Sequence, residues 1–152
     1  MSVFSSFGIN ASGLTAERFR MDIIAENIAN ANTTRTEDGT PYVRKVVTFQ
    51  EKNKTGATFS SMLASNQSKY NRYGGDGVKV GGVYEDKVSE MNMVYDPSHP
   101  DADENGYVLY PNVNTITEMT NLIDASRAYE ANSTAFAASK AIALQGLQLG
   151  QS

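Results

Sequence analysis

Residues 112–132 read NVNTITEMTNLIDASRAYEAN and open the longest stretch of helical periodicity in the chain. Apolar or small residues recur along it at intervals of seven, as Leu122, Tyr129, Phe136 and Ala143. The same stripe is extended by Met119, Ile123, Leu144 and Leu147. Thr115 and Glu118 have the spacing of a capping box, in which a hydroxyl and a carboxylate satisfy the first free backbone amides. Together these patterns predict a helix that starts near Thr115 and lasts to about Leu147.

A second stripe of the same spacing lies at the opposite end of the sequence. Its members are seven residues apart and are Phe7, Leu14, Met21 and Ile28. The asparagine-rich segment that follows, NIANANT at residues 27–33, supplies a stop signal, because Asn tolerates the left-handed conformation that ends many helices. We therefore expect a helix of about 25 residues within residues 1–34.

The region between these helices, residues 35–111, has a different pattern. Short runs rich in Val, Tyr and Thr are separated by Gly, Asn, Asp and Pro, which is typical of strands joined by turns. The expected strands are residues 42–49, 78–84, 91–95 and 107–110. Residues 52–76 are rich in Ser, Asn, Lys and Gly and predict a flexible insertion. The expected fold is α+β, with the helices of residues 1–34 and 112–152 packed as a coiled-coil-like pair beside a small β-rich middle region and a long loop.

The composition argues against several classes of function. The 152 residues carry a net charge of -4 with acids and bases mixed, so the basic stripe that nucleic acid requires is missing. The chain has no cysteine and a single histidine, His99, which excludes thiolate sites, a cysteine nucleophile and a multi-histidine metal site. No recognisable nucleophile accompanies His99. We therefore expect no catalytic activity, no cofactor and no bound metal.

The sequence also argues against two relations to membranes. No apolar run approaches the roughly 20 residues of a membrane-spanning helix, so membrane insertion is not expected. The first residues, MSVFSSFGINASG, lack the basic, apolar and small-residue segments of a cleaved secretory signal.

One acidic segment provides an alternative function. Residues 101–106, DADENG, match the start of an EF-hand calcium loop. The bidentate Glu that closes such a loop is replaced by Asn112, and Pro97 and Pro100 prevent an incoming helix. A plain acidic turn is favoured, and a soluble calcium-binding module is the alternative.

The polar positions of the last helix are unusual for a surface helix. Between residues 125 and 143, the face opposite the apolar stripe carries mostly Ala, Ser, Thr and Asn. A helix facing solvent normally carries Lys, Glu and Arg there. Two helices also cannot cover all of their own apolar surface, which points to neighbouring subunits. Periodicity alone is equally compatible with a monomeric helical hairpin that caps a small β domain.

The pairing of NIANANT with NVNTITEMTNLIDASRAYEAN at opposite ends of the chain resembles the terminal signatures of the flagellar axial proteins, the family of rod, hook and hook-associated proteins. Two further segments, residues 38–51 (DGTPYVRKVVTFQE) and 95–114 (YDPSHPDADENGYVLYPNVN), resemble its proximal rod type. The resemblance covers nearly the whole chain and fails over about residues 52–76. Residues that match the terminal signatures are Asn27, Asn30, Asn32, Glu118, Arg127, Glu130 and Asn132. Helical spacing would allow Arg127 to pair with Asp124 or Glu130.

The resemblance implies a structural subunit of the proximal rod, the drive shaft that transmits torque for motility. The implied assembly interface lies on the terminal helices, at Phe7, Leu14, Met21, Ile28, Met119, Leu122, Ile123, Tyr129, Phe136 and Leu144. Implied partners are other copies of the chain, other rod subunits, the basal-body membrane ring and rod adaptor, and the flagellar type III export apparatus. The implied location is the rod where it spans the periplasm, reached without a cleaved signal peptide.

Overall fold

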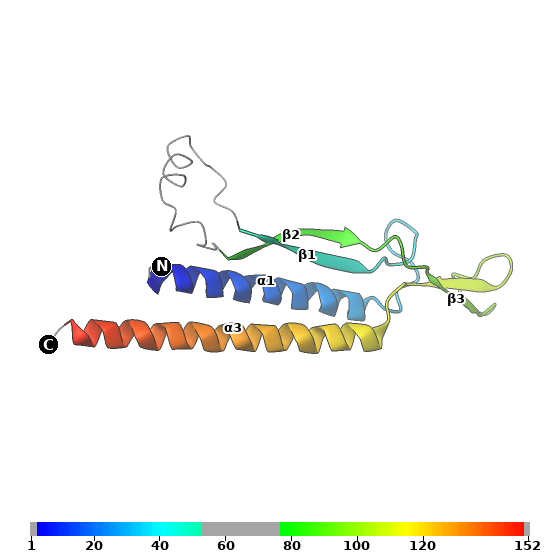
Figure 1. The fold of residues 1–152 in the computed structure, drawn as a ribbon. Coiled ribbons are helices and arrows are strands. Elements are labelled where there is room, and N and C mark those ends of the chain that lie inside the picture. Colours follow the sequence, from blue (N-terminus) through cyan, green and yellow to red (C-terminus); the bar gives the residue numbers. More distant parts are fainter. Residues whose placement is uncertain (1–2, 53–76, 151–152) are drawn as a thin grey trace, which may run out of the picture. The chain divides into compact units, whose positions relative to one another are not determined.

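The computed structural model describes residues 3–52 and 77–150 and shows an α+β chain (Figure 1). Two long helices occupy the two ends of the sequence, and four short strands lie between them. In chain order the elements are α1 (Val3–Ala29), β1 (Lys45–Glu51), β2 (Val78–Glu85), β3 (Asn92–Tyr95), β4 (Tyr107–Tyr110) and α3 (Thr115–Leu149). The predicted fold class is confirmed. The predicted insertion lies, from residue 53 onward, outside the described residues.

The start of α3 differs from the capping box expected there. Asn114 is the N-cap, because its Oδ1 accepts hydrogen bonds from the amides of Ile116 at 3.0 Å and Thr117 at 3.2 Å. The Glu118 side chain is instead buried in the protein interior, where it is 1% exposed. The predicted capping box of Thr115 and Glu118 is therefore wrong, since the cap lies one residue earlier and the carboxylate has tertiary partners.

The end of α1 uses asparagine in a different way from the one predicted. Among the described residues, no residue other than glycine has a positive φ, so the left-handed cap is not formed by Asn. Asn30 donates its side-chain amide to the Glu26 carbonyl at 3.0 Å and accepts the Thr33 hydroxyl at 3.1 Å. Side-chain hydrogen bonds of Asn30 therefore satisfy the end of this helix.

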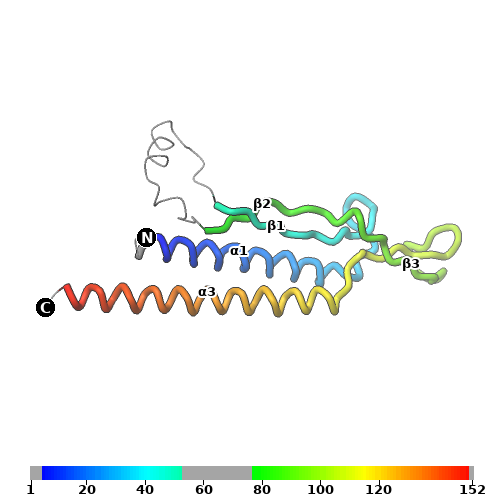
Figure 2. The backbone as a smooth tube through the Cα atoms, viewed as in Figure 1, coloured from blue at the N-terminus to red at the C-terminus, as the bar shows by residue number. Residues whose placement is uncertain are grey.

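The strands form two separate two-stranded sheets, β1 with β2 and β3 with β4. Figure 2 shows β1 and β2 side by side along their length. The β3–β4 pair is antiparallel, with Asn92 opposite Tyr110 and Tyr95 opposite Tyr107. All four predicted strands are present. The first begins at Lys45 rather than at residue 42, because the residues before it enter a side-chain network described below.

The described residues group into two compact units. The first comprises the described parts of Met1–Glu17, Phe49–Val80 and Ala128–Ser152, and the second comprises Arg18–Thr48 and Gly81–Arg127. Both helices and the β1 and β2 strands contribute residues to each unit.

In the first unit, α1 packs against α3 through small and aromatic side chains. The rings of Phe7 and Phe136 meet edge to face with centroids 5.1 Å apart. Gly13 lies so close to Asn132 that a Cβ on the glycine would be 3.0 Å from the amide oxygen. Since Phe7 meets Phe136 and Gly13 meets Asn132, the two helices run antiparallel here.

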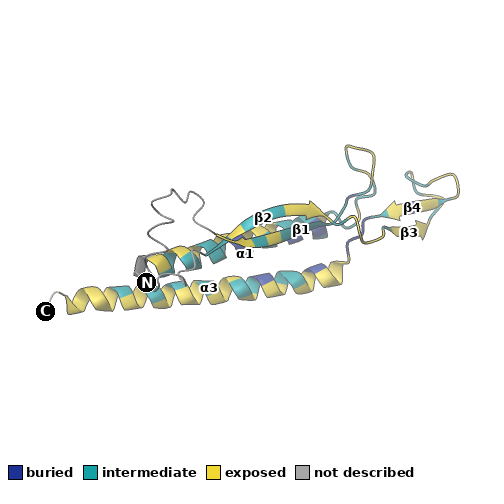
Figure 3. Ribbon diagram, turned by 45° about the horizontal axis from the view of Figure 1, so that its top comes forward, coloured by how far each residue is buried: buried dark blue, intermediate teal, exposed yellow. Residues whose placement is uncertain are grey.

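The second unit has a small core that mixes apolar and polar side chains. Its buried apolar members are Ile24, Tyr42, Val108, Val113 and Ala125. Asn27 and Glu118 are buried among them at 1% exposure each. Figure 3 shows that buried residues occupy only short stretches of each helix, and that the C-terminal part of α3 is largely exposed. Within the described ranges, no helix combines the length and hydropathy needed to cross a membrane.

Gly77 provides a test of the packing in the first unit. Its φ is +96°, and a Cβ there would lie 2.1 Å from Ser12 Oγ and 3.3 Å from Ile9 Cα. The Ser12 hydroxyl cannot move away freely, because it accepts the Val78 amide at 3.0 Å. We expect Gly77→Ala to lower the unfolding free energy by about 1–2 kcal/mol for the backbone conformation, with at least about 1 kcal/mol more for the clash.

Gly39→Ala is the matched control. Gly39 also has a positive φ, +77°, but nothing lies within 4 Å of a Cβ built there. Urea denaturation of both variants should show a clearly larger loss for Gly77→Ala, and equal losses would contradict the close approach of Ser12.

Candidate functional site

Asn27, near the end of α1, is the centre of a buried polar network. Its side-chain amide donates to the Lys45 carbonyl at 2.8 Å and to Glu118 Oε2 at 3.1 Å. Its Oδ1 accepts the Lys45 amide and the Tyr42 hydroxyl, both at 2.9 Å. Every hydrogen-bonding position of the Asn27 side chain is therefore used. Because it bonds both backbone groups of Lys45, it joins the first residue of β1 to α1 as a neighbouring strand would.

Glu118, in the first turn of α3, supplies the negative charge of the network. Its Oε1 accepts hydrogen bonds from Arg44 Nη2 at 2.7 Å and Nε at 3.0 Å, and from the Asn121 amide at 3.2 Å. With the contact from Asn27, both carboxylate oxygens are satisfied. A buried carboxylate is tolerated only when it is paired and hydrogen-bonded in this way.

Arg44 extends the network to the segment that follows β2. Its Nη1 lies 3.4 Å from Asp86 Oδ2, and its backbone amide donates to Asn112 Oδ1 at 2.9 Å. Asn112 in turn donates to the Asp86 carbonyl at 2.7 Å. The pKa of Asp86 is lowered mainly because its carboxylate accepts hydrogen bonds from the Ser89 amide and hydroxyl, with a smaller effect of Arg44. We call Asn27, Tyr42, Arg44, Lys45, Asn112 and Glu118 the Asn27–Glu118 network.

Tyr42 closes the network beside β1. Burial of its ring and hydroxyl, together with the nearby carboxylates of Glu26 and Glu118, raises its pKa to about 12. Lys45 Nζ is 2.5 Å from Glu26 Oε1 and lies over the Tyr42 ring at 5.6 Å from its centroid. The network thus joins the end of α1, the start of β1 and the start of α3 within the second unit.

Four of the residues that match the terminal signatures are buried or half-buried, and three are exposed. Asn27 and Glu118 come together in the network, and Asn30 closes α1. Asn132 donates to the Ala128 carbonyl at 3.0 Å and contacts Gly13 in the first unit. The remaining members are exposed and are Asn32, Arg127 and Glu130.

The suggested ion pairs of Arg127 are absent. Among the described residues, Arg127 has no salt bridge to Asp124 or to Glu130. An exposed guanidinium gains little from such a pair in water, which explains why the spacing alone does not produce one.

Sequence reasoning missed Tyr42, Arg44 and Asn112 as partners of the signature residues. A signal for them was present at Glu118, which stands four residues before Leu122 and seven before Ala125 on the inward stripe of α3. A carboxylate in that position requires a cation or several donors from elsewhere in the chain. The pattern does not say which cation, because that depends on how the segment before β1 folds back.

The residues predicted to form an assembly interface also fall into two groups. Half-buried members are Phe7, Leu14, Met21, Ile28, Leu122 and Phe136. Exposed members are Met119, Ile123, Tyr129 and Leu144. The Phe7–Phe136 contact lies inside the subunit. The exposed group remains available to a second molecule.

The acidic turn at residues 101–106 does not have the geometry of a calcium loop. Asp101 accepts the Thr34 hydroxyl at 2.8 Å and pairs with Arg35 at 3.6 Å. Asp103 Oδ1 accepts the amides of Asn105 and Tyr107. In the part of the chain that the structure describes, no three acidic, His or Cys side chains are placed to hold a metal ion. Both carboxylates stabilise the loop instead.

His99 has a local role in the same loop. Its Nδ1 accepts the Asp101 amide at 3.1 Å, and its ring lies 6.3 Å from that of Tyr110. This arrangement fixes the turn and provides no catalytic partner among the described residues.

Known proteins resemble this chain at both ends and over its whole length. The family described as flagella basal body rod protein matches residues 9–35, which contain NIANANT. The family described as flagellar basal body rod FlgEFG protein C-terminal matches residues 104–149, which contain α3 up to its last residue. Each match includes one half of the Asn27–Glu118 pair.

Individual relatives extend the similarity to nearly every residue. The flagellar basal-body rod protein FlgC of Bacillus subtilis is 44% identical, with 99% of this chain and 100% of the relative covered. FlgC of Borreliella burgdorferi is 42% identical, with 99% of each chain covered. FlgC of Salmonella typhimurium is 37% identical, with coverage of 99% of this chain and 100% of the relative.

The terminal helices carry uncovered apolar surface and are joined by a buried polar network. These features are typical of a structural protein that associates with other subunits. The chain belongs to the FlgC family of flagellar basal-body rod proteins, which confirms the proximal rod type indicated by its sequence. It is a structural subunit of the flagellar basal-body rod.

Glu118→Gln tests the importance of the buried charge. The variant keeps the shape of the side chain but removes the carboxylate that pairs with Arg44, so we expect a loss of about 2–3 kcal/mol in unfolding free energy. Glu130→Gln is the control, because Glu130 is exposed and should change stability by less than about 0.5 kcal/mol. Equal effects in urea denaturation would show that the network does not stabilise the subunit.

The raised pKa of Tyr42 predicts that the protein loses stability at alkaline pH. Its pKa is raised from 10.0 to about 12, so the folded state favours the neutral hydroxyl. The stabilisation of the folded state by the neutral Tyr42 hydroxyl is therefore complete below pH 10, and it is lost as the pH rises from 10 toward 12. Titration of tyrosinate absorbance should reveal one group that ionises near pH 12, and Tyr42→Phe should remove it. A titration unchanged by this substitution would contradict the assignment.

Proposed function

We propose that this rod subunit assembles with its neighbours through the exposed faces of its terminal helices and thereby transmits torque along the rod. The observation that carries the proposal is the apolar surface near the end of α3. Ile142, Leu144, Leu147 and Leu149 are exposed there by 52% to 79%. Successive residues of a helix are rotated by about 100°, so Ile142 and Leu149 lie on one side and Leu144 and Leu147 on roughly the opposite side. A helix that is apolar on two opposite sides is stable only when it is surrounded.

The start of α3 offers a second contact surface. Ile116, Met119 and Ile123 are exposed and are spaced by three and four residues, which places them in one stripe. The buried side chains of this helix segment, Glu118 and Ala125, lie on another face. The stripe is therefore separate from the contacts inside the subunit and is suited to pack against a helix of a neighbour.

The Asn27–Glu118 network supports transmission of force through the second unit. It connects α1, β1 and α3 by charge-assisted and neutral hydrogen bonds that leave none of the Asn27 positions unused. Relative sliding of these elements would leave buried polar groups unpaired, at about 1–3 kcal/mol for each. In this proposal the helices of residues 1–34 and 112–152 form the axial part, with the β-rich residues 35–111 beside them.

The proposal includes the partners and location expected of a proximal rod subunit. Its partners are other copies of the chain, other rod subunits, the basal-body membrane ring and the rod adaptor. The subunit reaches the periplasmic part of the rod through the flagellar type III export apparatus, without a cleaved signal peptide, and it acts mechanically and not as a catalyst. Support comes from the FlgC relatives, whose names place them in the basal-body rod.

A truncation after Ile142 tests the role of the α3 end. Removing the last exposed leucines should abolish rod assembly and motility while leaving expression intact, since the helix loses the surface that neighbours cover. The measurements are swimming in soft agar and recovery of the chain in isolated basal bodies. Normal swimming by the truncated strain would overturn the proposal.

A pair of substitutions separates lost surface from lost length. Leu144→Gln with Leu147→Gln should reproduce most of the defect, because both leucines are exposed in the isolated subunit. The matched control replaces two exposed polar neighbours, Gln145→Ala with Gln148→Ala, and should swim normally. A stronger defect in the control pair would contradict an apolar contact.

A further inference from the structure

The β3–β4 sheet has an open edge along β3. Among the described residues, β3 pairs with β4 alone, and all four residues of β3 are exposed. An unpaired edge presents backbone amides and carbonyls that another extended chain can bind. The start of β3 is also held to the residue after β4, because Asn92 donates its side-chain amide to the Pro111 carbonyl at 3.1 Å.

The register shows which backbone groups point outward. The Asp96 amide donates to the Gly106 carbonyl at 2.9 Å, so residues 96 and 106 form a hydrogen-bonded pair. Hydrogen-bonded and non-hydrogen-bonded pairs alternate along an antiparallel ladder. Met93 and Tyr95, opposite Leu109 and Tyr107, therefore belong to the alternate pairs. Their amides and carbonyls face away from β4.

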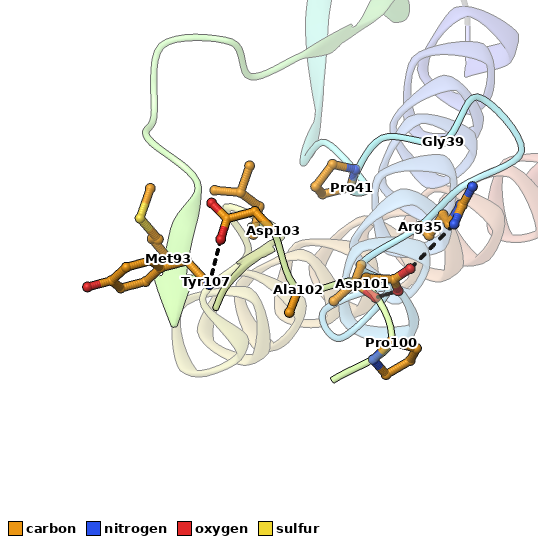
Figure 4. A pocket seen from close by; sticks show the side chains of 11 residues that line it. Arg35, Gly39, Pro41, Met93, Pro100, Asp101, Ala102, Asp103 and Tyr107 are labelled. Atoms are coloured by element: carbon orange, nitrogen blue, oxygen red, sulfur yellow. Dashed lines mark hydrogen bonds and ion pairs between the residues drawn. The ribbon is translucent and has the colours of Figure 1, made fainter. Parts of the chain in front are cut away.

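Two cavities are lined by residues of this sheet, one mainly by residues of each face. The first has a volume of about 460 Å³, and its lining includes Met93, Tyr107 and Leu109. Figure 4 shows Met93 and Tyr107 at one end of it. The second has a volume of about 520 Å³ and is lined by Asn92 and Val94 from the opposite face of the strand. Met93 lines both cavities. An extended segment beside β3 would point successive side chains to opposite faces, and so toward each cavity in turn.

The two cavities differ in charge. Figure 4 shows Asp103 beside Met93 and Tyr107, and the Arg35–Asp101 pair at the other end of the first cavity. The loop that carries these acids, residues 96–106, contains four acidic residues and no Lys or Arg. The second cavity has no charged residue in its lining, where Ala31, Val94 and Val113 lie together with polar Asn32, Asn92 and Thr115. A long cationic side chain suits the first cavity, because its methylene stem can lie on Met93, Tyr107 and Leu109. An aliphatic side chain suits the second cavity, because no charge lines it.

We propose that the outer edge of β3 binds an extended segment of another protein of the rod, in which Lys or Arg alternates with aliphatic residues. The added strand would bond to the outward groups of Met93 and Tyr95, place its cations over the acidic cavity and place its aliphatic side chains in the neutral one. This proposal rests on the proposed assembly function, and it adds a contact that does not involve the terminal helices.

The test uses the full chain and two capped peptides, Val-Lys-Val-Lys-Val and Val-Glu-Val-Glu-Val, with binding followed by fluorescence anisotropy. We expect the lysine peptide to bind at least about tenfold more tightly than the glutamate peptide. Met93→Pro should weaken binding of the lysine peptide about tenfold, because it removes an outward amide that β4 does not use. Met93→Leu keeps that amide and should bind as the native chain does.

A second variant tests the proposal without placing a proline in the hairpin. Leu109→Lys changes an exposed side chain of the first cavity and should weaken binding of the lysine peptide by charge repulsion while the chain unfolds as cooperatively as before. The proposal is overturned by equal affinity for the two peptides, by no binding of the lysine peptide, or by full binding to Met93→Pro. It is also overturned if Met93→Pro alters self-association of the chain alone, since the occupant would then be a second copy. Peptide binding does not depend on the α3 end, so its failure leaves the helix-assembly proposal intact.

Discussion

The buried carboxylate of Glu118 constrains the second unit more than any other group. It is 1% exposed and sits in the first turn of a long helix, so it must find its donors in other parts of the chain. Arg44, Asn27 and Asn121 provide them. Since Arg44 precedes β1 and Asn27 lies near the end of α1, the start of α3 can reach its low-energy position only when those two segments are in place. The interaction therefore selects one arrangement of three elements, where an apolar contact of similar size would allow several.

The rest of the subunit has little apolar material with which to stabilise itself. The buried apolar side chains are few and mostly small, while many large ones lie on the surface of α3 and of the β3–β4 hairpin. In the proposed assembly, this exposed apolar surface is the driving force for association. At the start of α3, the exposed apolar stripe of the proposal and the buried Glu118 lie on different faces of the helix.

Local patterns predicted most of the fold and only part of the site. Seven-residue spacing located both helices, and the Val- and Tyr-rich runs located all four strands, because each signal depends on residues close in sequence. Details that involve competition between partners were wrong. Thr115 and Glu118 have the right spacing for a capping box, yet Asn114 reaches the free amides and Glu118 is drawn to Arg44. Arg127 has acidic neighbours at helical spacing, but solvent competes successfully for its charge.

The sequence alone indicated the class of this protein through the resemblance of its paired terminal motifs to the flagellar axial proteins, whereas the periodic helices by themselves left a monomeric hairpin open. It also marked Asn27 and Glu118 as members of separate motifs. Only the tertiary structure showed that these two side chains meet, that Arg44 and Tyr42 complete their bonding, and which apolar residues of α3 stay uncovered. The physical reason is that periodicity records which face of an element is apolar, whereas the partner of a buried polar group depends on segments far apart in the chain. Those segments are brought together only by folding.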